Sequence, residues 1–205
     1  MHVALVNTNR IQPPIAPIGL DYVAEALNAA GHHVEILDLC WADDGVAAIA
    51  GFFNDDGADF GLVGATLRNT DDSVFTSRHS FLDEFADVVN TIRKHTDALI
   101  VLGGVGFSIM PEQVLELCEA DAGVWGDGEF TLVELANKLE EKREWLDLPN
   151  LIWRGNGRWH RNPPSNPPLT NLPPMRRSWI DNRRYFREGG QAGIETKRGC
   201  PGQCI

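Results

Sequence analysis

The chain contains five short apolar runs, rich in β-branched residues, that are separated by longer segments of mixed polarity. Each run is about five residues long, which suits a strand buried on both faces better than a helix. We therefore predict five buried strands, at Val3–Asn7, Val34–Asp38, Phe60–Ala65, Ala98–Leu102 and Ala122–Trp125.

Helical periodicity fills the segments between these runs. Apolar residues recur there every three or four positions, and glycine or proline marks several ends. The predicted helices are Gly19–Ala30, Ser80–His95, Pro111–Glu119 and Glu129–Glu141. Strands that alternate with helices are typical of a parallel sheet with helices on both faces. The predicted fold class is thus α/β, with a doubly wound, Rossmann-like, five-stranded parallel sheet flanked by helices.

The pattern changes near residue 150. Two short runs, Asn150–Arg154 and Arg158–Arg161, flank a glycine-bearing turn and predict a hairpin. Residues 163–174 contain six prolines, a composition that favours extended, semi-rigid chain. We expect residues 1–145 to form the first domain, and residues 146–190 to form a hairpin and a connector rich in proline and arginine.

Charge is distributed unevenly along the chain. Residues 1–150 carry 8 basic and 26 acidic side chains, whereas residues 151–205 carry 10 basic and 3 acidic ones. An acidic first domain argues against nucleic-acid binding, which depends on neutralising phosphates. We expect the connector arginines to pack against the acidic domain or a following one. No apolar run approaches the ~20 residues that span a bilayer, so we expect a cytoplasmic protein.

The loops that follow the predicted strands are unusual. Ligands of doubly wound sheets bind beyond the carboxyl ends of the strands, where these loops converge. Thr8–Gly19 is rich in proline, residues 66–73 are polar, and residues 103–108 and 126–129 are rich in glycine. Glycine lets the backbone approach a bulky ligand, although tight turns alone also explain it. The glycine spacing lacks the dinucleotide fingerprint, which disfavours nicotinamide or flavin binding.

The four cysteines are of two kinds. Cys40 and Cys118 are isolated among apolar neighbours and do not indicate a secreted disulfide framework. Cys200 and Cys204 form a Cys-x3-Cys run, and a third cysteine two positions beyond Ile205 would complete a Cys-x3-Cys-x2-Cys motif. Three such thiolates hold three irons of a 4Fe-4S cube and leave the fourth iron open. A disulfide or a chance pair is the alternative.

Residues 195–204 read Glu-Thr-Lys-Arg-Gly-Cys-Pro-Gly-Gln-Cys, which resembles the opening of the radical S-adenosylmethionine (SAM) barrel. The resemblance implies that Cys200 and Cys204 ligate a 4Fe-4S cluster whose open iron binds SAM. We therefore expect residues 191–205 to be the truncated start of that barrel, and the chain to be the amino-terminal part of a longer enzyme.

Three loop motifs precede this run: Pro-Pro-x-x-Pro-x-Gly-Leu, Gly-Gly-x-x-Phe-Ser before Pro-Glu, and Gly-Asp-Gly-Glu. Their order and placement resemble the cobalamin-binding domain of cobalamin-dependent radical SAM enzymes, over essentially the whole chain. Asp127 stands where that family more often has glutamate. The resemblance implies cobalamin contacts from Thr8, Pro14, Thr66, Arg68, Asn69, Thr70, Gly103, Gly104, Val105, Phe107, Ser108, Gly126, Gly128 and Glu129.

The sequence lacks the Asp-x-His-x-x-Gly element by which methionine-synthase-like domains supply a histidine to cobalt. His79 is the only histidine near the third loop, and we interpret it as a surface residue. The resemblance instead implies cobalamin with its nucleotide tail displaced and no protein ligand, with Arg68 near its lower face. A salt bridge to Asp71 or Asp72 is the alternative role of Arg68, and helix capping is that of Glu129.

The resemblance also implies a division of labour among cofactors, in which the cluster reduces SAM, the resulting radical abstracts a substrate hydrogen, and cobalamin delivers a methyl group. The protein would orient and shield these groups. We expect a methyltransferase that acts on an unactivated carbon, without identifying a catalytic residue. The implied partners are a small-molecule or peptide substrate, bound mainly by the missing barrel, and an electron donor such as flavodoxin or ferredoxin.

Three other functions stay open at this point. The chain could be a stand-alone cobalamin carrier without catalysis, part of a radical SAM cyclase, or a nucleotide-binding oxidoreductase domain. The residues do not indicate the substrate, the product or the oligomeric state.

Overall fold

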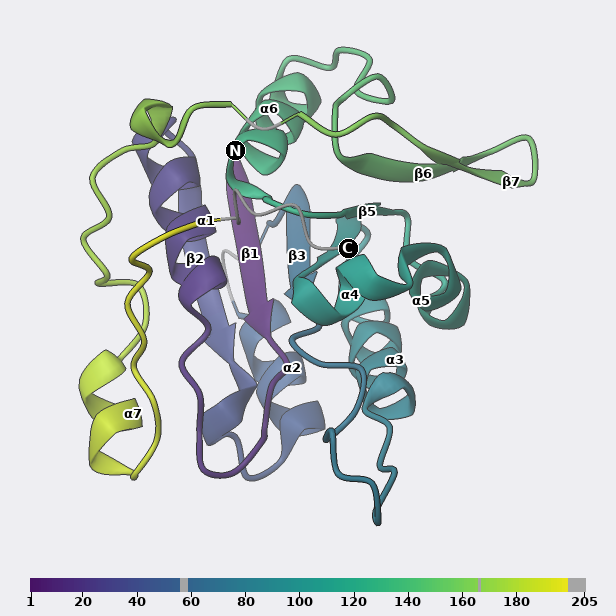
Figure 1. Ribbon diagram of the computed structural model, residues 1–205. Coiled ribbons are helices and arrows are strands. Elements are labelled where there is room, and N and C mark those ends of the chain that lie inside the picture. Colours follow the sequence, from purple (N-terminus) through teal and green to yellow (C-terminus); the bar gives the residue numbers. More distant parts are fainter. Residues whose placement is uncertain (56–58, 166, 199–205) are drawn as a thin grey trace, which may run out of the picture.

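The structure of the chain is a computed structural model that describes residues 1–55, 59–165 and 167–198 (Figure 1). Within these residues, seven strands form one sheet in the order β2-β1-β3-β4-β5-β6-β7. The first five strands pair in parallel and are β1 (His2–Asn7), β2 (His33–Asp38), β3 (Leu62–Thr66), β4 (Leu99–Gly103) and β5 (Ala122–Val124). Each overlaps a predicted strand, so the predicted α/β class with a doubly wound parallel sheet is confirmed.

The predicted hairpin is present, but it extends the sheet. Strand β6 (Leu151–Gly155) pairs antiparallel with β5 and then with β7 (Arg158–Arg161). The sheet is therefore mixed and seven-stranded, where five parallel strands were expected. The physical reason is the exposed edge of β5, whose unpaired N–H and C=O groups are satisfied by a neighbouring strand. Figure 1 shows the hairpin projecting from one end of the sheet.

Helices cover both faces of the sheet. Helices α1 (Ile18–Ala29) and α6 (Glu129–Glu140) pack on one face, and α2 (Gly45–Phe53), α3 (Leu82–Arg93) and α5 (Pro111–Cys118) pack on the other. Alternate residues of the strands serve the two layers, since Val3 and Leu5 pack beneath α1 and α6 whereas Ala4 and Val6 face α2 and α3. The four predicted helices are confirmed within one or two residues.

Helix α2 was not predicted. Its amino-terminal end is capped by Asp44, whose carboxylate accepts hydrogen bonds from the backbone N–H groups of Val46 (2.9 Å) and Ala47 (3.0 Å). Ile49 and Phe53, one turn apart, are buried against the sheet. An aspartate followed by apolar residues four positions apart is the sequence signal for such a helix.

Two short α-helices and two 3-10 helices also lie outside the predictions: α4 (Val105–Ile109), α7 (Asn182–Arg187), η1 (Leu39–Trp41) and η2 (Leu169–Asn171). In the part of the chain that the structure describes, no helix has the length and apolarity needed to cross a membrane.

The carboxyl ends of the central strands lie in one row. Asp38 of β2 is paired in register with Asn7 of β1, Asn7 with Thr66 of β3, and Thr66 with Gly103 of β4. Because β2 lies on one side of β1 and β3 on the other, the loops after β1 and β3 diverge at this row. Such a topological switch point is where α/β sheets of this strand order bind ligands.

Candidate functional site

The carboxyl end of β2 is covered by α7, which follows the proline-rich connector (Figure 1). Tyr185 of α7 is fully buried, and its hydroxyl donates a hydrogen bond to Asp38 Oδ2 (2.9 Å). Asn7 Nδ2 donates to the other oxygen, Asp38 Oδ1 (2.7 Å). Burial and the neighbouring Asp38 carboxylate raise the pKa of Tyr185, so its hydroxyl stays a donor. This side of the edge is therefore filled, whereas Val105 and Ile109, which follow β4, have exposed side chains.

The first loop, after β1, is held from two directions. Thr8 Oγ1 donates to the carbonyl oxygen of Thr66 (2.8 Å), which ties this loop to the third. Pro14 is buried, and its carbonyl oxygen accepts a hydrogen bond from the Gln191 N–H (2.8 Å). The structure thus gives Pro14 a packing role beneath the connector, and its expected contact with cobalamin stays a prediction.

The loops after β3 and β4 are packed against each other through two glycines. Gly104 has φ +102°, and a Cβ there would lie 2.5 Å from the Leu67 carbonyl oxygen. Gly106 donates its N–H to the carbonyl oxygens of Leu67 and Arg68 (3.0 Å each), and a Cβ there would lie 2.9 Å from the backbone of Asn69. Only glycine allows this approach, which sets the height of the third loop above the sheet.

The polar residues of the third loop are half-buried and only partly engaged. Arg68 Nη1 donates to Asn69 Oδ1 (2.5 Å), and Thr70 Oγ1 donates to Asp71 Oδ2 (3.2 Å). Among the residues that the structure describes, Arg68 forms no ion pair, so the alternative of a salt bridge to Asp71 or Asp72 is not found. The guanidinium of Arg68 keeps donors for a ligand at this edge.

The fourth and fifth loops are joined by Ser108. Its hydroxyl donates to the carbonyl oxygen of Gly104 (3.0 Å) and accepts from the N–H of Gly126 (3.0 Å). On the same short helix, Val105 and Ile109 are 75% and 65% exposed, whereas Phe107 is fully buried in the core. The side chain of Val105 is accessible for the predicted contact with cobalamin, whereas the side chain of Phe107 is not accessible in this conformation.

The fifth loop is braced by a residue that the sequence reasoning missed. Asn150 is 2% exposed, and its Nδ2 donates to the carbonyl oxygen of Trp125 (3.1 Å) while its Oδ1 accepts from the N–H of Ser165 (2.8 Å).

Glu129, at the start of α6, is 3% exposed and forms an ion pair with Arg198 at 2.8 Å. The structure therefore assigns the Glu129 carboxylate a protein partner at the position where a cofactor contact was expected.

Potential metal ligands lie elsewhere or outside the described residues. His79 is exposed and pairs with Glu84 (3.1 Å), in keeping with a surface residue. Cys40 and Cys118 are buried free thiols, and burial raises the pKa of Cys118 to about 12, so it stays protonated and unreactive. Cys200 and Cys204 lie outside the residues that the structure describes.

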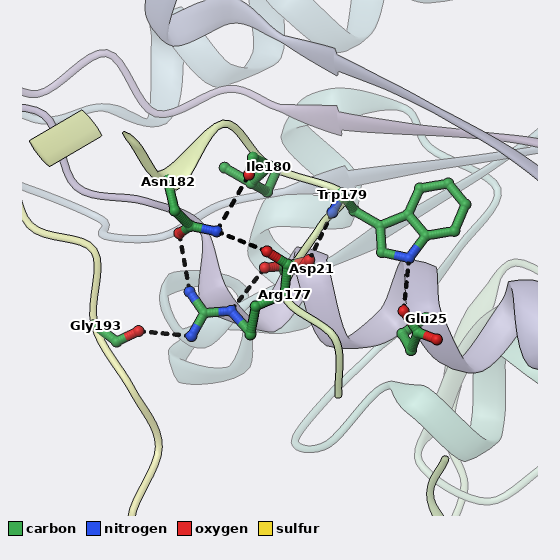
Figure 2. A network of polar contacts seen from close by, with 7 residues as sticks. All are labelled: Asp21, Glu25, Arg177, Trp179, Ile180, Asn182 and Gly193. Atoms are coloured by element: carbon green, nitrogen blue, oxygen red, sulfur yellow. Dashed lines mark hydrogen bonds and ion pairs between the residues drawn. The ribbon is translucent and has the colours of Figure 1, made fainter. Parts of the chain in front are cut away.

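The acidic residues of α1 are covered by the connector, as Figure 2 shows. Asp21 is 1% exposed and accepts hydrogen bonds from Arg177 Nε (2.7 Å) and from the backbone N–H of Trp179 (3.2 Å). Glu25 accepts from the indole N–H of Trp179 (3.0 Å). The expectation that connector arginines pack against the acidic domain is confirmed for Arg177.

Two cavities lie between the connector and the helices. One, of about 200 Å³, is lined by residues such as Phe130 and Leu169, and the other, of about 170 Å³, by residues that include Tyr22 and Arg198. Both are smaller than the ~300–1,000 Å³ that enclose drug-sized ligands. They lie apart from the loops after β3 and β4, so a bulky ligand at the carboxyl edge would lie across an open surface.

The open surface suits a broad, flat ligand such as a corrinoid. The exposed side chains of Val105 and Ile109 offer apolar contact, and the glycines keep the loops after β3 and β4 closely packed. The Arg68 guanidinium in the third loop offers hydrogen-bond donors. His79 is the described histidine nearest in sequence to the third loop, and its side chain pairs with Glu84. The described residues therefore fit a corrinoid, and the absence of a histidine ligand stays a prediction.

Comparison with known proteins bears on the same elements. A family model described as a B12 binding domain matches residues 4–136, which run from β1 to α6. Tryptophan 2-C-methyltransferase of Streptomyces laurentii is 34% identical over 253 aligned positions, which take in 98% of this chain and 42% of that protein.

Solved structures give the same result. The radical S-adenosylmethionine methyltransferase TsrM from Kitasatospora setae, with cobalamin and a [4Fe-4S] cluster bound, matches with a TM-score of 0.87 and 33% identity, over 99% of this chain and 40% of that chain. OxsB, a cobalamin-dependent S-adenosylmethionine radical enzyme, matches with a TM-score of 0.76 over 97% of this chain and 27% of that one. At 19% identity, OxsB supports the fold alone.

This chain spans only 42% and 40% of the two more similar proteins, so the similarity concerns one part of them. The predicted resemblance to the cobalamin-binding part of cobalamin-dependent radical SAM enzymes is confirmed. The matched residues contain the parallel strands, apart from the first two residues of β1, and the loops at their carboxyl ends. The chain belongs to the B12-binding domain family.

Proposed function

We propose that this chain binds cobalamin across the loops after β3, β4 and β5 and is the amino-terminal part of a cobalamin-dependent radical SAM methyltransferase. The observation that carries the proposal is the carboxyl edge of the sheet. Gly104 and Gly106 let the loops after β3 and β4 pack closely against each other there, and the side chain of Val105 beside them is exposed. The similarity to TsrM and to tryptophan 2-C-methyltransferase supports methyl transfer, and the expectation that the acceptor is an unactivated carbon stays part of the proposal.

The remaining cofactors and partners belong to the same proposal. Cys200 and Cys204 would ligate a 4Fe-4S cluster that binds SAM, and Arg68 would lie near the lower face of the corrinoid. Cobalamin, when bound, supplies a methyl carrier, and the cluster supplies the electron that cleaves SAM. An electron donor such as flavodoxin or ferredoxin, a substrate bound mainly by a following barrel, and a cytoplasmic location complete the proposal.

Cobalamin binding is tested by mixing the purified 205-residue chain with hydroxocobalamin under anaerobic conditions and removing free corrinoid. We expect stoichiometric retention and the visible spectrum of base-off cobalamin, because the sequence lacks the Asp-x-His-x-x-Gly element that would supply a histidine to cobalt. A base-on or histidine-bound spectrum would contradict the proposed geometry. A colourless protein would instead favour a nucleotide-binding domain, which nicotinamide and flavin titrations on the same sample would reveal.

A further inference from the structure

The last described residues of the chain lie against the B12-binding sheet through Arg198. Its Nη2 lies 2.8 Å from Glu129 Oε1, and its Nη1 lies 3.6 Å from Asp127 Oδ2. Glu195, three residues earlier, accepts from Nε (3.0 Å) and Nη2 (2.8 Å) in a bidentate pair. These carboxylates raise the pKa of the Arg198 guanidinium above its ordinary value, with Glu195 contributing most. Arg198 is therefore a fixed cation between the fifth loop and its own segment.

Glu129 depends on this arginine. Its side chain is 4% exposed, and Arg198 is its only ion-pair partner among the described residues. A buried carboxylate that lacks a partner is strongly unfavourable. Glu129 lies in the first turn of α6, where the helix dipole favours an acid, but among the described residues its carboxylate contacts the Arg198 guanidinium and not a backbone N–H of the helix. Capping alone thus leaves the burial of Glu129 unexplained, whereas the ion pair explains it.

The segment that leads to Arg198 is held at two further points. Gln191 exchanges backbone hydrogen bonds with the first loop, donating to the Pro14 carbonyl oxygen (2.8 Å) and accepting from the Ala16 N–H (2.9 Å). Arg177 Nη1 donates to the carbonyl oxygen of Gly193 (2.6 Å), a contact that Figure 2 shows. Arg198 is the last of three contacts, and it stands two residues before Cys200.

We propose that Arg198 is a positioning residue, whose ion pair with Glu129 and Asp127 holds residues 191–198 against the fifth loop of the B12-binding sheet. The inference rests on the proposed function, because residues 191–198 lead in the sequence directly to the proposed cluster ligands. It also gives the Gly-Asp-Gly-Glu motif a role. Asp127 and Glu129 of this motif pair with the Arg198 guanidinium, so the Glu129 carboxylate contacts the protein and not the cofactor.

The distance between Arg198 and Asp127 leads to a second, independent prediction. Arg198 Nη1 is buried and, among the described residues, has no hydrogen-bond partner, because the Asp127 carboxylate stops at 3.6 Å. One additional methylene brings a carboxylate into hydrogen-bond range of Nη1. An Asp127→Glu variant should therefore hold the segment more tightly than the natural residue does.

The test is hydrogen–deuterium exchange of the 205-residue chain, followed over residues 190–198 by mass spectrometry. Arg198→Met should raise exchange in these residues about tenfold or more and leave the strands of the sheet unchanged, since local opening is governed by local contacts. Arg198→Lys should lie between the two, because a lysine keeps the charge without the planar fork. Asp127→Glu should slow the exchange. The matched control is Arg187→Met, since Arg187 is exposed and forms no ion pair within the described residues.

Two outcomes would overturn the inference: equal exchange in Arg198→Met and Arg187→Met, or faster exchange throughout the sheet, which indicates general destabilisation. Hydroxocobalamin titration of the same samples separates this inference from the proposed function. Unchanged affinity in Arg198→Met supports the positioning role, whereas a loss of affinity places the arginine in cofactor binding and overturns it. Failure of the natural chain itself to bind cobalamin refutes the proposed function, whatever the exchange rates show.

Discussion

Replacing Arg177 with methionine is expected to lower the free energy of unfolding by about 3–5 kcal/mol, the cost of removing one partner from a buried ion pair. Asp21 is 1% exposed, and Arg177 is its only ion-pair partner among the described residues. A whole domain is stable by only ~5–15 kcal/mol, so this change removes a large share. Urea denaturation followed by tryptophan fluorescence measures the effect, because Trp179 lies beside the pair.

The two sides of this pair should not be equivalent. Asp21→Asn should cost less than Arg177→Met, because the Arg177 side chain is 20% exposed and keeps hydrogen bonds to Asn182 and Gly193. The double variant should recover about 1 kcal/mol or more of the loss, since it leaves no buried charge. Methionine is a suitable replacement because, like arginine, it is an unbranched L-residue, so the backbone strain of the positive φ of 56° at this position is unchanged. A loss within ~0.5 kcal/mol of that in Arg187→Met would contradict the assignment.

Replacing Gly104 with alanine is expected to weaken cobalamin binding by about 100-fold, or ~2.7 kcal/mol. The new Cβ would meet the Leu67 carbonyl oxygen at 2.5 Å and Thr66 Oγ1 at 2.6 Å, so the third loop must move from its height above the sheet. The positive φ of 102° adds strain of ~1–3 kcal/mol. Affinity is measured by visible titration with hydroxocobalamin, and stability by urea denaturation.

Gly157→Ala is the matched control for this prediction. Gly157 also has a positive φ, of 74°, but a Cβ there meets nothing within 4 Å, and it lies in the turn between β6 and β7. This variant should lose stability through backbone strain and keep the affinity of the natural chain. Natural affinity in Gly104→Ala, or an equal loss in both variants, would show that the loop packing at Gly104 does not shape the binding surface.

The positions of the strands and major helices could be read from the sequence because burial there follows a local rule. A strand buried on both faces must be apolar throughout, as Val63 and Ile100 illustrate, and a covering helix must repeat its apolar face every turn, as Phe85 and Val89 do. The loops of the candidate site were also located in advance, because a parallel sheet brings the carboxyl ends of its strands to one edge.

The partners of polar residues could not be predicted in the same way. Glu129 carries the local signals of a helix start and a glycine loop, and these do not indicate Arg198, which is distant in the sequence. Tyr185 and Arg177 likewise gain their roles from Asp38 and Asp21. The partner of a polar side chain depends on which groups lie near it and on whether it is buried away from water. Both are determined by the folded structure and not by the local sequence.

The sequence by itself therefore determined the α/β sheet, the edge that carries the site, and the cysteine and glycine motifs that indicate cobalamin and a cluster. The tertiary structure decided that the hairpin joins the sheet, that the connector closes the edge over β2, and that Glu129 serves Arg198. The difference has one physical cause. Apolar burial is summed over local periodic patterns, whereas pairing of charges, strand edges and hydrogen-bonding groups depends on contacts between residues far apart in the chain.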